Sequence, residues 1–169
     1  TEITINPGYI QGNVYGASKE TVIKYNTEIK MLKGKVKGAI FGASRKISTD
    51  SDVLGVTRIL MKDGDVYGNG EKGAIFGGGS NGSRVLNTAN SNDLTRFATS
   101  VIVTGGNIHN NVYGGNKKQT NSSPVHGSSL VDISAGKVTS QKDVYGGGIK
   151  SETSGRTEVY IGSATAQNN

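Results

Sequence analysis

Hydrophobic and polar residues alternate over short stretches of the chain, and each stretch ends at a glycine. In residues 3–16, Ile3 and Ile5 flank a polar residue and precede Gly8, and a second apolar set then ends in the sequence Val-Tyr-Gly. An alternation with a period of two residues is typical of β-strands. Glycine suits tight corners because it adopts a positive φ that other residues resist. The pattern predicts two short strands, each followed by a glycine corner.

The same unit returns along the whole chain. Residues 29–44 align with residues 3–18 without a gap, and the third copy carries extra residues, 67–71, between its two halves. The copies begin at Ile3, Ile29, Ile59, Val101, Val131 and Val159. Repetition at spacings of 26 to 42 residues indicates a repeat architecture, in which each unit buries its apolar face against its neighbours.

A unit with two or three short strands and glycine corners predicts one coil of a β-solenoid. Coils stacked about 4.8 Å apart would place equivalent residues in ladders through the core. One such ladder comprises Ile5, Met31, Met61, Val103, Ile133 and Ile161. We therefore expect an all-β, right-handed parallel β-solenoid (a β-helix) of about five coils plus a partial sixth. An antiparallel sandwich is the alternative, because short strands separated by turns also suit that fold.

The alignment also predicts the remaining strands of each coil. Ile10 and Val14 have the same parity, which predicts a single second strand with both side chains pointing inward. The apolar pairs Val22-Ile23 and Val53-Leu54 in the linkers predict a third strand. We expect residues 1–169 to form one domain, as a module of a longer repeat protein. Its variable linkers would set the surface that meets a partner.

Three copies end in Val-Tyr-Gly, two of them with further glycines. They are Val14-Tyr15-Gly16, Val112-Tyr113-Gly114-Gly115 and Val144-Tyr145-Gly146-Gly147-Gly148. They resemble the Val-Tyr-Gly-Gly-Gly repeats of large bacterial surface proteins, which are adhesin-like parallel β-helices found notably in gut bacteria. The resemblance covers nearly the whole chain apart from the linkers, and it departs at Phe41, Phe76, Ala17 and Ala43. It implies a non-enzymatic adhesin-type stalk or binding module that is secreted or lies on the bacterial cell surface.

Composition and charge narrow the classes of function. The absence of cysteine excludes disulfides and thiolate metal sites. No apolar run approaches the roughly 18 residues of a membrane span, so we expect no membrane insertion. The net charge of +6 permits attraction to polyanions, including host or bacterial surface glycans. No nucleic-acid-binding module is recognisable, and the glycine-rich residues 77–82 lack the lysine of a phosphate loop, so we expect no nucleic-acid partner.

An aromatic residue precedes the second glycine corner in five copies. These residues are Tyr15, Phe41, Phe76, Tyr113 and Tyr145. Each follows an inward-facing Val or Ile, so alternation places it on the opposite face. If exposed, the five rings would form a stripe suited to stacking on sugar rings, and they are the predicted ligand-binding residues. The alternative is that a linker or the glycine corner covers them, in which case they stabilise the fold.

Acidic residues gather at the insertion of the third copy. Asp63, Asp65 and Glu71 border it, together with Asn69. Oxygen atoms at alternating positions are ligands that Ca²⁺ accepts, so these carboxylates are a candidate calcium site. The spacing is not that of an EF-hand loop, and a solvated acidic loop is the alternative reading. We expect no other cofactor.

The sequence offers little support for catalysis. His109 occupies an outward polar position of its strand, and His126 lies in a serine-rich linker, so spacing does not bring them together. The acidic residues are spread over linkers and corners, with Asp50 and Asp52 as one small pair. A polysaccharide-degrading β-helix enzyme would need carboxylates converging on one face. It therefore stands as an alternative to the binding module.

The ends of the chain suggest a second alternative. Both lie in repeat-like sequence, and neither has an evident cap. Uncapped coils expose strand edges that pair with other strands. End-to-end self-association into an extracellular filament would follow from such pairing.

Overall fold

The chain is built almost entirely from parallel β-structure. The computed structural model describes residues 1–46, 51–70, 72–88, 96–117, 124–138 and 142–162. No α-helix occurs in these ranges. Accordingly, none of the described segments is a helix that could cross a membrane.

Every strand pairs in parallel with its counterpart in the next coil. The strands are β1 (Glu2–Ile5), β2 (Tyr9–Ile10), β3 (Val14–Tyr15), β4 (Thr27–Met31), β5 (Lys35–Val36), β6 (Ile40–Phe41), β7 (Thr57–Met61), β8 (Asp65–Val66), β9 (Ile75–Phe76), β10 (Phe97–Ile108), β11 (Val112–Tyr113), β12 (Ser128–Val138), β13 (Val144–Tyr145) and β14 (Thr157–Ile161). They form two sheets, a larger one of nine strands and a smaller one in the order β13-β11-β9-β6-β3. The expected parallel solenoid is confirmed, and the antiparallel sandwich is wrong.

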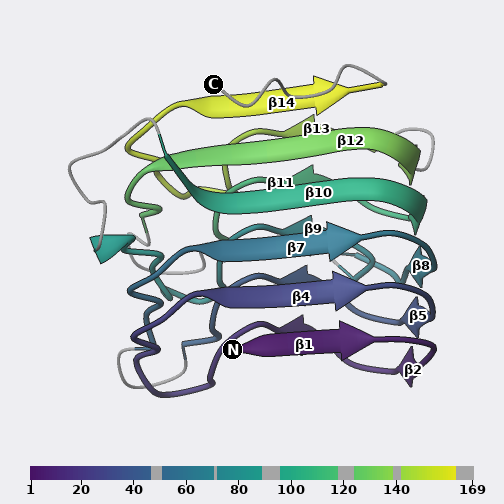
Figure 1. The fold of residues 1–169 in the computed structure, drawn as a ribbon, viewed down its shortest axis with the longest axis horizontal. Coiled ribbons are helices and arrows are strands. Elements are labelled where there is room, and N and C mark those ends of the chain that lie inside the picture. The colour runs from purple at the N-terminus through teal and green to yellow at the C-terminus, as the bar shows by residue number, and fades with distance from the viewer. Residues whose placement is uncertain (47–50, 71, 89–95, 118–123, 139–141, 163–169) are drawn as a thin grey trace.

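Five complete coils are followed by β14, which begins a sixth. The long strands β1, β4, β7, β10, β12 and β14 stack as one row of the larger sheet. In Figure 1 these strands run from left to right at the front, and the chain returns behind them before it rises to the next coil. This path is a right-handed coil, as expected for parallel crossovers.

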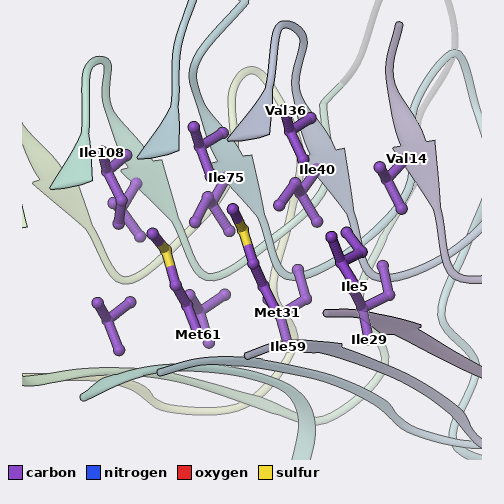
Figure 2. Close-up of a cluster of buried hydrophobic side chains, with 14 of the residues drawn as sticks. Ile5, Val14, Ile29, Met31, Val36, Ile40, Ile59, Met61, Ile75 and Ile108 are labelled. Carbon is purple, nitrogen blue, oxygen red and sulfur yellow. The ribbon is translucent and has the colours of Figure 1, made fainter. Parts of the chain in front are cut away.

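The predicted core ladder is confirmed residue by residue. Its members Ile5, Met31, Met61, Val103, Ile133 and Ile161 are register partners in consecutive long strands. All of them except Ile161 pack with the inward residues of the returning strands in one apolar cluster (Figure 2). Met31 and Met61 are completely buried, whereas Ile161 is 67% exposed because β14 has no described strand beyond it.

The prediction of a single second strand is wrong. Ile10 belongs to β2, in the larger sheet, and Val14 belongs to β3, in the smaller sheet. Residues 11–13 turn the chain between them, and Gly12 lies in that turn. Both apolar side chains still pack against the same core because the turn re-aims the chain around the corner of the coil.

The prediction of a third strand is only partly confirmed. Ile23 and Val53 form an isolated parallel bridge, which Val85 and Val125 continue in the next coils. Val53, Val85 and Val125 are buried in a small cluster of their own. A second row of isolated bridges joins Arg45, Ser80, Lys117 and Ile149. These single bridges close the linker side of the solenoid without making a regular strand.

The two glycine corners differ in backbone conformation, although stacked backbones approach closely at both. At the first corner Gly34, Gly64, Gly106 and Gly136 have positive φ angles, which confirms the conformational reason for glycine there. At the second corner the reason is space. A Cβ added to Gly77 would lie 2.3 Å from the carbonyl oxygen of Gly114 in the next coil. Only glycine lets the stacked backbones approach so closely.

A buried hydroxyl closes each inner coil at the same corner. The Thr57 Oγ1 donates a hydrogen bond of 2.5 Å to the Gly77 carbonyl oxygen, from the start of β7 to the end of β9. The equivalent pairs are Thr27 with Gly42, Thr99 with Gly114 and Ser129 with Gly146. These bonds satisfy carbonyl groups that the tight corner would otherwise bury without a donor.

Candidate binding surface

The insertion of the third coil forms the rim of an open hollow. This hollow, of about 460 Å³, is lined by Lys37, Tyr67, Gly68, Asn69, Lys72 and His109. We call it the loop hollow. Its side chains come from three consecutive coils, because Lys37, Tyr67 and His109 follow the register partners Val36, Val66 and Ile108. The expected outward position of His109 is confirmed, since its side chain is 45% exposed.

Backbone hydrogen bonds hold the floor of the loop hollow. The Tyr67 N–H donates to the Val36 carbonyl, and the His109 N–H donates to the Val66 carbonyl, each at 2.9 Å. The rings of Tyr67 and His109 meet edge to face with centroids 6.2 Å apart. A hydrogen bond with the Tyr9 hydroxyl, aided by burial, raises the pKa of Tyr67. Tyr67 is therefore a fixed neutral ring at neutral pH.

Asn110 anchors the returning end of the insertion. Its Nδ2 donates to the Lys72 carbonyl oxygen at 3.1 Å and also to the carbonyl oxygen of Gly70. The Gly73 N–H donates to the Gly38 carbonyl at 2.7 Å, which returns the chain to the coil below. The rim is thus tied to two neighbouring coils, a rigid arrangement that suits a preformed site.

A second hollow adjoins the first. It has a volume of about 290 Å³ and is lined by Asn13, Ala39, Phe41, Asn69, Lys72 and Lys117. We call it the ladder hollow, because it opens over the aromatic residues. Asn69 and Lys72 line both hollows, so the two form one surface on either side of the insertion.

The predicted aromatic residues form a continuous stack. Neighbouring rings of Tyr15, Phe41, Phe76, Tyr113 and Tyr145 have centroids 4.7 to 5.0 Å apart and lie within 6° of parallel. The prediction that they face away from the main core is confirmed, because Phe41 and Phe76 pack with alanines in a separate cluster.

The stack is not a uniformly exposed stripe. Phe41 and Phe76 are buried, and both faces of each ring are covered by neighbouring rings. Tyr145 is 44% exposed and has a stacking partner on one side among the described rings. A ligand-binding role of the ladder stays a prediction, and Tyr145 offers the largest exposed ring surface for it.

Each tyrosine hydroxyl in the stack has a partner two residues earlier. Asn13 Nδ2 donates to the Tyr15 hydroxyl at 3.1 Å, and Asn111 Nδ2 donates to the Tyr113 hydroxyl at 2.8 Å. The Tyr145 hydroxyl donates to Asp143 Oδ2 at 2.9 Å. In the two phenylalanine copies this earlier position holds alanine, Ala39 and Ala74, which pack in the apolar cluster. This matching of polar residue to tyrosine is visible in the sequence, and our sequence analysis missed it.

The contact between the Asp143 carboxylate and the Tyr145 hydroxyl can be tested by titrating the hydroxyl. The hydrogen bond to Asp143, with burial, raises the pKa of Tyr145 above its ordinary value. The contact therefore stabilises the fold at neutral pH and is lost as the pH rises through the raised pKa. In Asp143→Asn we expect the alkaline titration of tyrosinate absorbance to begin at lower pH. An unchanged titration curve would show that Asp143 does not hold this proton.

The two described candidate calcium ligands, Asp63 and Asp65, each have hydrogen-bond partners within the fold. Asp63 Oδ1 accepts a hydrogen bond of 2.7 Å from the Gly64 N–H. Asp65 Oδ1 accepts one of 3.0 Å from Asn107 Nδ2 and lies 3.7 Å from His109 Nε2. Glu71 lies outside the described residues. Within the described ranges no three acidic, histidine or cysteine side chains form a metal-binding group, and calcium binding stays a prediction.

The remaining candidates for catalysis are also separate. His126 follows the bridge residue Val125 on the linker side, whereas His109 lies on the loop hollow. Asp52 is buried and accepts hydrogen bonds from Arg84, with Nε at 3.0 Å, so its carboxylate is part of a structural ion pair. Asp50 lies outside the described residues.

Comparisons with known proteins add no family to this picture. No protein-family model, curated protein or solved structure matches the chain.

Proposed function

We propose that the chain is a non-enzymatic, adhesin-type binding module that holds a glycan in the loop hollow, at the bacterial cell surface or outside the cell. The observation that carries this proposal is the loop hollow itself. The insertion of the third coil joins a tyrosine, an asparagine, two lysines and a histidine around one concavity. Function in repeat folds tends to reside in such insertions on a rigid scaffold.

The chemistry of the lining suits a sugar. Tyr67 supplies an aromatic surface, and Asn69 supplies an amide that can both donate and accept hydrogen bonds. A sugar ring presents apolar C–H groups and hydroxyl groups together, so it needs both kinds of partner. The open shape also fits a chain of sugars that enters and leaves the site, rather than an enclosed small molecule.

An enzymatic function has weaker support. General acid–base cleavage of a sugar chain uses two carboxyl groups that flank the same bond. Among the described residues, the lining of the loop hollow contains no carboxylate, and Asp65 beside it is engaged by Asn107 and His109. Lysine and histidine alone favour binding over hydrolysis.

A filament has one observation in its favour. At the end of the described coils Val159 and Ile161 occupy core-ladder positions and are 40% and 67% exposed. However, β14 extends the larger sheet beyond the last described strand of the smaller sheet, β13. Among the described strands, none occupies the position of the smaller sheet that would lie between β13 and the β3 of a second copy whose β1 paired with β14. The binding module is therefore the better supported function.

The test is a glycan-array screen followed by calorimetry with any sugar that binds. We expect Tyr67→Ala to weaken binding about tenfold, a loss of about 1.4 kcal/mol. Tyr25→Ala is the matched control, because Tyr25 is 78% exposed and lines neither hollow. Tyr145→Ala tests the aromatic ladder separately. The proposal fails if the parent chain binds no glycan, or if Tyr67→Ala binds as tightly as the parent with an unchanged melting temperature.

A further inference from the structure

We infer that the glycan bound in the loop hollow is acidic, with a sulfate or carboxylate group held between Lys37 and Lys72. This inference rests on the proposed function and adds the chemical class of the ligand. It comes from the charges around the loop hollow, where the described residues place two cations and no anion in the lining.

Several cations of the solenoid are paired with a carboxylate. Lys30 contacts Glu2 and Glu28, Arg58 contacts Glu28, and Arg156 contacts Glu158, all within ion-pair distance. Neither Lys37 nor Lys72 has such a partner in the part of the chain that the structure describes. Other lysines, such as Lys24 and Lys33, also have no ion-pair partner among the described residues. What distinguishes Lys37 and Lys72 is that two unneutralised ammonium groups line one hollow, where a ligand can supply the opposite charge.

Among the described residues, the carboxylate of Asp65 beside the loop hollow is turned to other partners. Asp65 Oδ1 accepts the Asn107 amide at 3.0 Å and lies 3.7 Å from His109 Nε2. Asp65 is the register partner of Lys35, so it belongs to the ladder of equivalent positions next to the ladder that contains Lys37. It therefore orients the histidine at the edge of the loop hollow and is not among the residues that line it.

The lysines are placed to act together. Lys37 follows β5 in the second coil, and Lys72 closes the insertion of the third coil. The Lys72 backbone is held by Asn110, and the Lys37 N–H donates 2.7 Å to the Ile10 carbonyl, so both side chains begin from fixed backbone. Hydrogen bonds from ammonium to an anionic oxygen are about twice as strong as neutral ones. An anionic group reached by both would therefore dominate the selectivity of the site.

The experiment compares sugars that differ only in charge. The probes are a sulfated oligosaccharide with its desulfated counterpart, and an oligogalacturonate with its methyl ester. The variants are the double substitution Lys37→Gln, Lys72→Gln and the control Lys24→Gln, Lys33→Gln. Lys24 and Lys33 are exposed, line neither hollow and change the net charge by the same amount.

We expect the parent chain to bind at least one acidic probe about tenfold more tightly than its neutral counterpart. The Lys37→Gln, Lys72→Gln variant should lose this preference, while the control variant keeps it. Added salt should weaken binding of the acidic probe in the parent, because exposed charges are screened over about 10 Å at 0.1 M. Whichever acidic probe binds identifies sulfate or carboxylate as the source.

Other outcomes overturn the inference in distinguishable ways. Equal affinity for acidic and neutral probes would refute the acidic ligand and leave the glycan-binding function standing. An equal loss in both double variants would assign the preference to the overall charge of the chain, not to the loop hollow. If no probe and no sugar of the array binds the parent, the proposed function and the inference both fail.

Discussion

Gly77→Ala is expected to lower the free energy of unfolding by about 3 kcal/mol, the upper part of the range for overpacking a tight interior. The added Cβ would lie 2.3 Å from the Gly114 carbonyl oxygen and 3.2 Å from Thr99 Cβ. Neither atom belongs to the far end of a flexible side chain, so the coils themselves must move apart. Urea unfolding followed by far-ultraviolet circular dichroism would measure the loss.

Gly12→Ala is the matched control for this prediction. Gly12 lies in the turn between β2 and β3, and a Cβ there meets no atom within 4 Å. Its φ is not positive, so alanine fits the existing backbone. We expect stability to stay the same or to rise by about 0.4–1 kcal/mol, because alanine restricts the unfolded chain. Equal losses at Gly12 and Gly77 would contradict close backbone stacking as the reason for the second glycine corner.

Phe76→Ala is expected to destabilise the fold by about 3–5 kcal/mol, as for other buried phenylalanines. Phe76 is completely buried, and its ring stacks on Phe41 at 4.8 Å and on Tyr113 at 4.7 Å. Truncation leaves a cavity in the middle of the stack and uncovers a face of both neighbouring rings. Thermal and urea unfolding would both report the change.

Tyr145→Ala separates the fold role of the stack from a surface role. Tyr145 is partly exposed, and its one ring contact is with Tyr113 at 5.0 Å. We expect a loss of less than about 1.5 kcal/mol, the range for one aromatic pair. If Tyr145→Ala destabilised the chain as much as Phe76→Ala, the stack would act as one cooperative unit. Burial of a ring would then not determine how much that ring contributes to stability.

The sequence by itself determined the solenoid coil, the long strand of each coil and the register between coils. Apolar residues at equivalent positions predicted the complete ladder from Ile5 to Ile161, and the structure pairs each of them as predicted. The aromatic positions were predicted in the same way. This succeeded because each copy repeats the same local pattern, and the ladder positions stack in parallel register, so that equivalent residues in the sequence are in contact in space.

The path of the chain within one coil was harder to predict from the sequence. The chain turns between Ile10 and Val14, yet both residues pack inward, so their shared parity looked like one continuous strand. The corner at Gly77 is set by a carbonyl group of the next coil, which no local pattern reveals. Burial of Phe41 and Phe76 likewise depends on rings and alanines from neighbouring coils.

Only the tertiary structure decided the candidate site. Lys37 and His109 are separated by 72 positions along the chain, and they line one hollow because the two steps from coil to coil between them each advance by a single strand spacing. The insertion then brings Lys72 back over the same place. Residues that repeat can be recognised in the sequence by their period, whereas the residues of the loop hollow do not follow the repeat. A site of unlike residues, gathered from different coils, becomes visible only when the coils are stacked.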